Sequence, residues 1–353
     1  MTDEAVDRSR ARGRRASARP GMREVADYAG VAMSSVSRVL SNHPDVSPEM
    51  RERVERAVEQ LGYQPDMLAQ SLRRRTTNTV GFVVGDISNP LLATIALGAE
   101  TALRMAGNSM LLTNSENRPD LDAAHVRLLT QRRVDGLLLS LAAEDDADTI
   151  ALLRRAEIPI VLIDRELPPV VEASAVLSDH RGGMRDAVGH LLDLGHRRIG
   201  LILGHRLRFS RERLLGLRDA YAERGLPDES LVLEGTLAET HGREATARML
   251  QDASPVTAIV VGGNQLLIGT LSELRDRGLQ VGEDISLVSC DAISVTEFFS
   301  PPIAVVRRDN EAIGQQAAEL LLEQIRDEQA PRQITLPTEF VARDSCRPPR
   351  SAR

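Results

Sequence analysis

The apolar positions of residues 22–61 recur at helical spacing and fall into three short groups. Gly30 separates the first two groups, and an Asn-His-Pro break separates the second from the third. Ser47, followed directly by proline, has the pattern of a helix N-cap, and Gly62 is typical of a residue that ends a helix. The segment therefore predicts three helices in a compact module spanning 21–64.

Beyond Thr79 the pattern changes to short aliphatic runs that alternate with longer stretches of helical periodicity. Runs that are apolar at every position predict strands buried on both faces, as in parallel sheets covered by helices. Nine runs are predicted to be strands: Val80–Val84, Met110–Thr113, Gly136–Leu139, Ile160–Ile163, Ala175–Leu177, Ile199–Leu203, Leu231–Leu233, Ala258–Val261 and Ile285–Val288. This alternation predicts an α/β fold, and about 270 residues are too many for one sheet. We therefore expect two doubly wound subdomains, at about 78–177 with 308–337 and at about 178–307 with 338–345.

Charge is distributed unevenly along the chain of 353 residues, which has 44 basic and 51 acidic side chains. Every basic residue is Arg, because the sequence contains no Lys. The net charge of -7 would argue against a polyanionic partner. Residues 1–75, however, carry 14 Arg against 11 acids, so the basic excess lies at the N-terminal end. The acidic run Glu144-Asp145-Asp146 is predicted to cap the helix that follows the strand Gly136–Leu139.

Several classes of protein are disfavoured. No apolar run approaches the ~18 residues that a membrane span needs, and the Arg-rich first twenty residues do not have the pattern of a signal peptide. Cys290 and Cys346 lie far apart and match no zinc-ligand spacing. The common nucleotide-binding and hydrolase motifs are absent from the sequence. We therefore expect neither a metal nor another cofactor, no membrane partner and no enzymatic activity.

Residues 22–40 read MREVADYAGVAMSSVSRVL and predict two helices joined by a tight turn at Gly30. The second helix carries Ser34, Ser35, Ser37 and Arg38 outside an apolar frame. Small hydroxyl groups and a guanidinium on one outward face suit the major groove of DNA. The alternative is a generic helical hairpin with a solvated polar face.

This stretch resembles the lactose/galactose repressor family of bacterial transcription factors, whose N-terminal signature has the form VA-x-x-AGVS-x-x-TVSRVLN. The resemblance implies that Met33 and Ser34, which open the second helix, select the operator and that Arg38 contacts bases or backbone. Ser35 and Ser37 complete the expected DNA-binding set on this helix. One departure is Ala32, where the family usually has a Ser or Thr N-cap, and the missing cap costs ~1 kcal/mol.

The module is flanked by two further basic segments. Residues 1–20 have the composition of a disordered Arg-rich arm. Residues 65–77 contain a helical pattern that is marginal in isolation, followed by three consecutive Arg. The family resemblance implies a hinge helix whose Leu72 wedges into the minor groove and kinks the duplex, while Arg73 neutralises phosphate charge. The alternative is a plain basic linker.

Polar residues follow several predicted strands, where a doubly wound fold binds ligands. The resemblance, which extends over residues 22–345, implies an effector-binding set that consists of Asp86, Asn89, Asp164, Arg213, Asn264 and Asp291, and Phe298 joins this set as an aromatic residue near Asp291 in the sequence. The fork-shaped guanidinium and the acidic and amide acceptors suit a hydroxyl-rich or anionic small ligand. Phe298 could supply an apolar or stacking wall, or belong to the core. Each polar residue taken singly could also be an ordinary surface group.

Together these features predict an effector-responsive transcriptional regulator, most consistent with a repressor. One helix-turn-helix covers only half a site, so we expect a homodimer, or alternatively a tetramer, on a near-palindromic double-stranded operator. The expected effector is a small polar molecule of the sugar or sugar-derivative class. We expect the protein in the cytoplasm and at the nucleoid when bound. The rival interpretations are a solute-binding protein of a transport system, which a signal peptide would mark, and an enzyme on an α/β scaffold.

Overall fold

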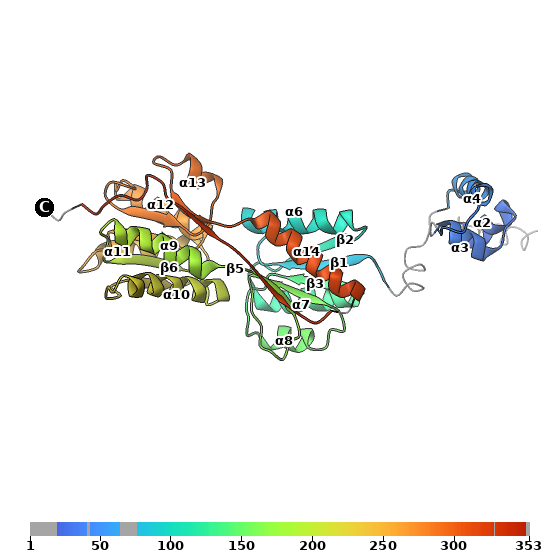
Figure 1. Cartoon of the computed structure of the whole chain (residues 1–353), viewed down its shortest axis with the longest axis horizontal. Coiled ribbons are helices and arrows are strands. Elements are labelled where there is room, and N and C mark those ends of the chain that lie inside the picture. Colours follow the sequence, from blue (N-terminus) through green and yellow to red (C-terminus); the bar gives the residue numbers. More distant parts are fainter. Residues whose placement is uncertain (1–19, 41–42, 64–75, 328, 351–353) are drawn as a thin grey trace, which may run out of the picture. The chain divides into compact units, whose positions relative to one another are not determined.

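The computed structural model describes residues 20–40, 43–63, 76–327 and 329–350. The chain divides into two compact units, at residues 1–77 and 78–353 (Figure 1). Except for Pro20, the arm expected at residues 1–20 lies outside the described residues. Leu72 and Arg73 of the expected hinge helix lie outside them as well.

The first unit contains the three predicted helices, α2 (Met22–Ala29), α3 (Met33–Leu40) and α4 (Pro48–Leu61). The hydroxyl of Ser47 accepts the amide of Met50 at 3.3 Å, which confirms the predicted N-cap of α4. Gly30 adopts a left-handed φ of 63°, which ends α2 and permits the tight turn. Arg53 of α4 donates from Nη2 to the carbonyls of Ala29 (2.5 Å) and Gly30 (3.0 Å), so it holds the turn against the third helix.

The second unit contains two six-stranded sheets in the orders β11-β5-β4-β3-β1-β2 and β12-β10-β9-β8-β6-β7. The first sheet consists of β1 (Thr79–Val84), β2 (Ser109–Asn114), β3 (Gly136–Leu139), β4 (Ile160–Ile163), β5 (Ser174–Ser178) and β11 (Gln333–Leu336). The second consists of β6 (Ile199–Leu203), β7 (Leu231–Glu234), β8 (Ala258–Val261), β9 (Ser286–Ser289), β10 (Ala304–Arg307) and β12 (Glu339–Val341). Every pairing is parallel except that of β10 with β12. The predicted α/β class is thus confirmed.

Helices cover both faces of each sheet, so each sheet and its helices form a subdomain. The first subdomain contains α6 (Pro90–Met105), α7 (Pro119–Gln131), α8 (Ala147–Leu153) and α14 (Asn310–Asp327). The second contains α9 (His180–Asp193), α10 (Arg208–Glu223), α11 (Glu239–Gln251), α12 (Asn264–Asp276) and α13 (Ser294–Phe298). The chain crosses between the subdomains after β5, β10 and β11, so the two are joined by three connections. Among the described residues, no helix is both long and apolar enough to cross a bilayer.

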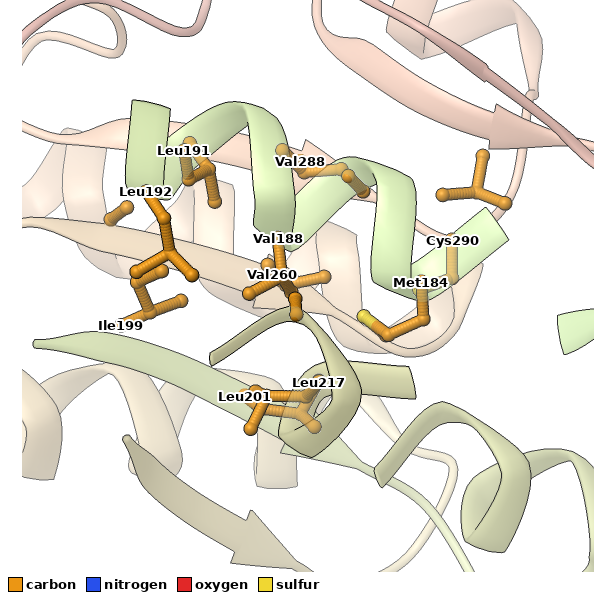
Figure 2. Packing of buried hydrophobic residues seen from close by; sticks show 14 of the residues in the cluster. Met184, Val188, Leu191, Leu192, Ile199, Leu201, Leu217, Val260, Val288 and Cys290 are labelled. Atoms are coloured by element: carbon orange, nitrogen blue, oxygen red, sulfur yellow. The ribbon is translucent and has the colours of Figure 1, made fainter. Parts of the chain in front are cut away.

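Aliphatic side chains fill the space between the helices and the sheet in the second subdomain. Figure 2 shows the cluster formed by Met184 and Val188 of α9, Leu217 of α10, Leu201 of β6 and Val260 of β8. All five are fully buried, and burying an aliphatic side chain contributes ~1.5–3 kcal/mol. Strands buried on both faces explain why their sequence is apolar at every position.

Helices α6 and α14 lie side by side in the first subdomain (Figure 1). A Cβ at Gly314 of α14 would lie 1.9 Å from the carbonyl oxygen of Ile95, and a Cβ at Gly98 of α6 would lie 2.2 Å from that of Glu311. No side chain fits at these distances, so the close approach of the two helices depends on a glycine from each. This contact places α14, which follows β10, back on the first subdomain.

Candidate functional site

Helix α3 presents a polar face in the first unit. Val36 and Val39 are buried in the core of the unit, whereas Met33, Ser34 and Arg38 are exposed. Ser35 and Ser37 of the same helix are half-buried. Positions three and four apart share a helix face, so Ser34, Ser37 and Arg38 lie together. Five of the seven residues that the sequence assigned to DNA contact therefore occupy one short helix held in place by two valines.

The second unit has a cavity between its two subdomains, at the carboxyl ends of β1, β4, β8 and β9. The empty space, including the open mouth, is about 650 Å³. The predicted effector residues that line it are Asp86, Asn89 and Asp164 from the first subdomain and Arg213, Asn264 and Asp291 from the second. The structure thus brings six of the seven predicted residues to one cavity, where doubly wound folds bind ligands.

The seventh residue, Phe298, does not line this cavity, so the expectation of an aromatic wall from this side chain is wrong. Phe298 is the last residue of α13 and its side chain is 86% exposed. The helix carries it away from Asp291 and the end of β9. The aromatic side chain at the cavity is instead Phe209 of α10. The guanidinium carbons of Arg165 and Arg213 lie over its ring, 5.3 Å and 5.2 Å from the centre.

Asp164 is the centre of a buried polar network in the cavity wall. Its φ of 49° lies in the left-handed region, which non-glycine residues seldom adopt, and such strain is concentrated at functional sites. The carboxylate accepts the amide of Ser178 at 2.6 Å and its hydroxyl at 3.0 Å. Arg308 donates to the same carboxylate, and Nε2 of His180 lies 3.4 Å away.

Burial by itself would raise the pKa of Asp164, but the contacts with His180, Arg308 and the Ser178 amide hold this pKa below its ordinary value. Burial lowers the pKa of His180 to about 4; the charges of Arg213 and Arg308 add to this, and Asp164 opposes it. At neutral pH, therefore, Asp164 is a carboxylate and His180 is uncharged. Arg308 supplies the positive charge that balances Asp164.

Arg213 and Asp291 form a second charged group on the other side of the cavity. Arg213 is 4% exposed, and its Nη1 donates to the carbonyl of Gly262 at 2.8 Å. The Oδ1 atom of Asp291 lies 3.9 Å from Nη2 of Arg213 and 3.7 Å from Nη2 of Arg308. These distances give electrostatic attraction without a hydrogen bond, so both guanidinium groups remain able to bind another acceptor.

Two amide side chains of the second subdomain meet polar groups of the first across the cavity. Nδ2 of Asn264 donates to Oδ1 of Asn89 at 3.1 Å, and Nε2 of Gln265 donates to Oδ2 of Asp86 at 3.0 Å. A change in the angle between the subdomains would break both hydrogen bonds. The cavity is therefore bounded by contacts that depend on how far the cleft is closed.

Four buried polar atoms in this region have no hydrogen-bond partner among the described residues: Oδ1 of Asp291, Nε of Arg308, Oγ of Ser210 and Nε2 of His180. Asp291 and Arg308 line the cavity, Ser210 follows the lining residue Phe209, and His180 contacts the lining residue Asp164. Leaving a buried polar atom unpaired costs ~1–3 kcal/mol. A polar ligand with both donor and acceptor groups could pair the two atoms that line the cavity. Within the same ranges, no cluster of three or more His, Cys, Asp or Glu residues could hold a metal ion.

Arg308 is the functional residue that the sequence-based interpretation missed most clearly. It follows β10, which was not among the predicted strands, although Ala304–Arg307 begins with three apolar residues. An Arg directly after such a run is the signal that could have identified it, because polar residues at the carboxyl ends of parallel strands converge on ligands. Phe209 and His180 carry no comparable signal, since their positions depend on the folding of distant segments.

The comparisons with known proteins agree with this geometry. Residues 21–66 match the sequence model of the bacterial regulatory proteins of the lacI family, and residues 188–346 match a periplasmic binding protein-like domain. The HTH-type transcriptional repressor PurR of Haemophilus influenzae is 33% identical over 333 residues, which cover 92% of this chain and 98% of the relative. The HTH-type transcriptional regulator DegA of Bacillus subtilis is 30% identical over 330 residues, covering 92% and 97%.

Solved structures of similar proteins also cover nearly the whole chain. The lac repressor dimer bound to operator and the anti-inducer ONPF has a TM-score of 0.81 at 26% identity, over 94% of this chain and 100% of that chain. The complex of the transcriptional regulator CelR with cellobiose has a TM-score of 0.70 at 34% identity, over 93% and 100%. These relatives are transcriptional regulators rather than transport components, which supports the regulator over the solute-binding alternative. The resemblance expected from the sequence is confirmed, and the chain belongs to the lacI family of bacterial DNA-binding transcriptional regulators.

Proposed function

We propose that this regulator is a homodimeric repressor whose affinity for a near-palindromic operator is controlled by a small polar effector in the cavity between the subdomains. The observation that carries the proposal is the set of unpaired buried polar atoms at the cavity, above all Oδ1 of Asp291 and Nε of Arg308. An effector that pairs them would bind one closure angle best and shift the subdomains toward it. A coupling of ~1–3 kcal/mol would then change operator affinity.

The charges of the cavity favour a neutral polar effector over an anion. Its lining contains three guanidinium groups, Arg165, Arg213 and Arg308, and three carboxylates, Asp86, Asp164 and Asp291. The lining is thus already balanced, and an anion would leave a carboxylate without its partner. Two guanidinium groups lie over the Phe209 ring, which disfavours an effector held by ring stacking. A hydroxyl-rich sugar or sugar derivative fits these features, and the CelR–cellobiose complex supports that class.

The effector proposal is tested by thermal unfolding of the full chain in the presence of neutral sugars, sugar acids and nucleosides. A ligand at 100 times its Kd stabilises the native state by ~2.7 kcal/mol. We expect a neutral sugar to raise the melting temperature of the natural protein and not that of Arg213→Ala. Arg218→Ala on the exposed face of the same helix is the matched control. Stabilisation that is retained in Arg213→Ala would contradict the proposal.

The proposed DNA interface is the outward face of α3 together with Leu72 and Arg73. An operator selected from random duplexes serves as the probe in an anisotropy titration. Arg38→Ala should weaken operator binding by ~1–3 kcal/mol. Arg56 is an exposed residue of α4 that pairs with Glu52, so the control variant Arg56→Ala should leave operator affinity unchanged. Leu72→Ala should weaken binding and abolish the kink in a bent-DNA assay. Equal affinity of Arg38→Ala and the natural protein would refute the assignment.

The dimer is supported by apolar side chains that the single chain leaves exposed. Leu97 and Met105 on α6 are 60% and 80% exposed, and Phe298 is 86% exposed. Near Phe298, a groove whose empty space, including its open mouth, is about 1430 Å³ is lined by several apolar side chains, among them Leu271, Val295 and Phe299. Exposed apolar patches mark interaction surfaces, and the similar lac repressor structure is described as a dimer. We propose that a second copy of this chain covers these exposed apolar side chains and the groove. We also propose that the dimer is a cytoplasmic protein.

A further inference from the structure

Helix α10 begins at the cleft without a cap from its own neighbourhood. Its N-cap residue, Leu207, makes no side-chain cap hydrogen bond, and the first turn contains no acidic residue. The first amides of a helix have no partner within the helix and need an acceptor. That acceptor is Glu144 of the first subdomain, whose two carboxylate oxygens both lie 3.1 Å from the amide nitrogen of Arg208.

Glu144 was predicted, with Asp145 and Asp146, to cap the helix that follows β3. Asp146 does cap that helix, α8: its carboxylate accepts the amide of Thr149 at 2.8 Å. For Glu144 the prediction is wrong, because its side chain reaches the other subdomain. The acidic run therefore serves two helices, one on each side of the cleft.

The carboxylate of Glu144 is 9% exposed and is surrounded by donors from both subdomains. Oε1 accepts the amide of Glu166 at 2.9 Å, within the first subdomain. Oε2 accepts Nη1 of Arg211, in the first turn of α10, at 2.6 Å. Arg211 also donates from Nη2 to the Glu166 carboxylate at 3.1 Å. A negative charge at the positive end of α10 adds to these charge-assisted hydrogen bonds.

The same end of α10 carries residues of the cavity. Phe209 and Arg213 lie one and five residues after Arg208, and both line the cavity. The hydrogen bonds of Glu144 hold this part of the helix against the first subdomain. The contact between Asn264 and Asn89 joins the subdomains through other loops. An opening of the cleft that separates α10 from the first subdomain must expose Glu144 and remove the cap of α10.

We propose that Glu144 is a positioning residue that holds the cleft closed by capping α10 from the opposite subdomain, and that it thereby sets the positions of Phe209 and Arg213. The proposal rests on the proposed function only where it treats the cavity as an effector site. Its prediction for the cleft itself requires no effector.

Hydrogen exchange followed by mass spectrometry on the full chain, without added ligand, tests this role. Glu144→Ala should accelerate exchange at least tenfold in peptides spanning 208–212 and also in those spanning 262–266, which include Asn264, whose side chain donates to Asn89 across the cleft. Glu144→Gln keeps one acceptor oxygen and should give a smaller effect in the same peptides. Asp145→Asn removes the same charge from the exposed neighbouring side chain and should change neither. Peptides covering β6 should exchange as in the natural protein in all three variants.

Faster exchange confined to 208–212 would mean that Glu144 is only a local cap, and the proposal would be overturned. If Glu144→Ala destabilises the whole unit, hydrogen exchange in β6 will be faster as well. The variant Arg211→Ala then tests the proposal, because it removes a single half-exposed partner of Glu144. That variant must accelerate 262–266 while β6 is unchanged, or the proposal fails. If a ligand stabilises the protein in thermal unfolding but hydrogen exchange in Glu144→Ala equals that of the natural protein, the role of Glu144 is rejected and the proposed function stands. If exchange in the cleft is faster in Glu144→Ala but no ligand stabilises the protein, the effector proposal is rejected and the role of Glu144 stands.

Discussion

Replacing Arg308 by Met should destabilise the second unit far more than replacing its neighbour Arg307 by Met. Arg308 donates to Asp164, and the two side chains are 14% and 5% exposed. Arg307 pairs with Glu339 at 2.6 Å, but those side chains are 58% and 62% exposed. The two substitutions remove the same charge from adjacent positions, so only the surroundings of the ion pairs differ.

The expected magnitudes follow from that difference in burial. Removing one partner of a buried ion pair costs ~3–5 kcal/mol, because the other charge is left without compensation. An exposed pair contributes ~0–1 kcal/mol, because water and salt screen it. One kcal/mol corresponds to ~2–4 °C in the melting temperature of a domain of about 200 residues. Arg308→Met should therefore lower the melting temperature at neutral pH by ~6–20 °C, and Arg307→Met by no more than ~4 °C.

Thermal and urea unfolding at a series of pH values tests the electrostatic origin of the effect. In the natural protein the folded pKa of Asp164 lies below its ordinary value, so the stability it provides is complete above about pH 4 and is lost as the pH falls through the folded pKa. In Arg308→Met the main compensating charge is gone and burial raises the pKa of Asp164. Protonation of Asp164, or of His180 3.4 Å away, then relieves the buried charge. The gap in stability between Arg308→Met and the natural protein should therefore narrow on acidification.

The reasoning would be refuted if Arg308→Met and Arg307→Met lost the same stability within about 1 kcal/mol, the upper limit for an exposed pair. A gap that is independent of pH would attribute the loss to packing of the Arg308 stem rather than to its charge. The double variant Asp164→Asn with Arg308→Met separates these terms, because it removes both charges. We expect it to be more stable than Arg308→Met alone.

Three further predictions concern packing, titration and assembly. Gly314→Ala should cost ~1–3 kcal/mol in thermal unfolding through overpacking against the carbonyl of Ile95, whereas Gln315→Ala on the exposed face of α14 should be nearly neutral; equal losses would refute the close contact. Burial lowers the pKa of His196, so stability should decline as the pH falls from about 6.5 toward the folded pKa, and a decline that is as steep in His196→Asn would exclude this residue as a cause. Phe298→Ser should shift sedimentation toward the monomer at low micromolar concentration, and an unchanged distribution would remove Phe298 from the dimer surface.

The elements that could be predicted are those whose signals are local. The cap at Ser47 and the end at Gly62 depend on residues within one turn, and both are found as expected. The nine predicted strands coincide with β1–β9 to within one residue at either end, because each is a short, largely apolar run. Most of these strands are buried on both faces, whereas the edge strands β2 and β7 are not. Strands β10, β11 and β12 were not predicted. The latter two lie at sheet edges with mostly exposed or half-buried residues, so they lack a continuous apolar pattern.

The candidate site divides in the same way. Asp86, Asp164 and Asp291 could be found because each follows a strong strand signal, and the carboxyl ends of parallel strands converge. Phe298 was assigned from its distance to Asp291 along the chain, which α13 makes misleading. Phe209 lines the cavity although nothing in its local sequence distinguishes it, since its position depends on the packing of α10 against α9 in the folded subdomain.

Local patterning was sufficient to identify the helix-turn-helix, the α/β class and the edge of the sheets where polar residues gather. The partners of the charged groups were not accessible in this way. Arg308 pairs with Asp164 across 144 positions of sequence, and Glu144 caps α10 across 64. Glu144 joins the first subdomain to the second, and Arg308, in the segment that crosses between them after β10, pairs with Asp164 of the first. The strength of both pairs depends on burial and on distances of a few ångström. Hydrophobic periodicity specifies which face of an element is buried, but not which distant element covers it, and the folded arrangement alone determines which charges meet.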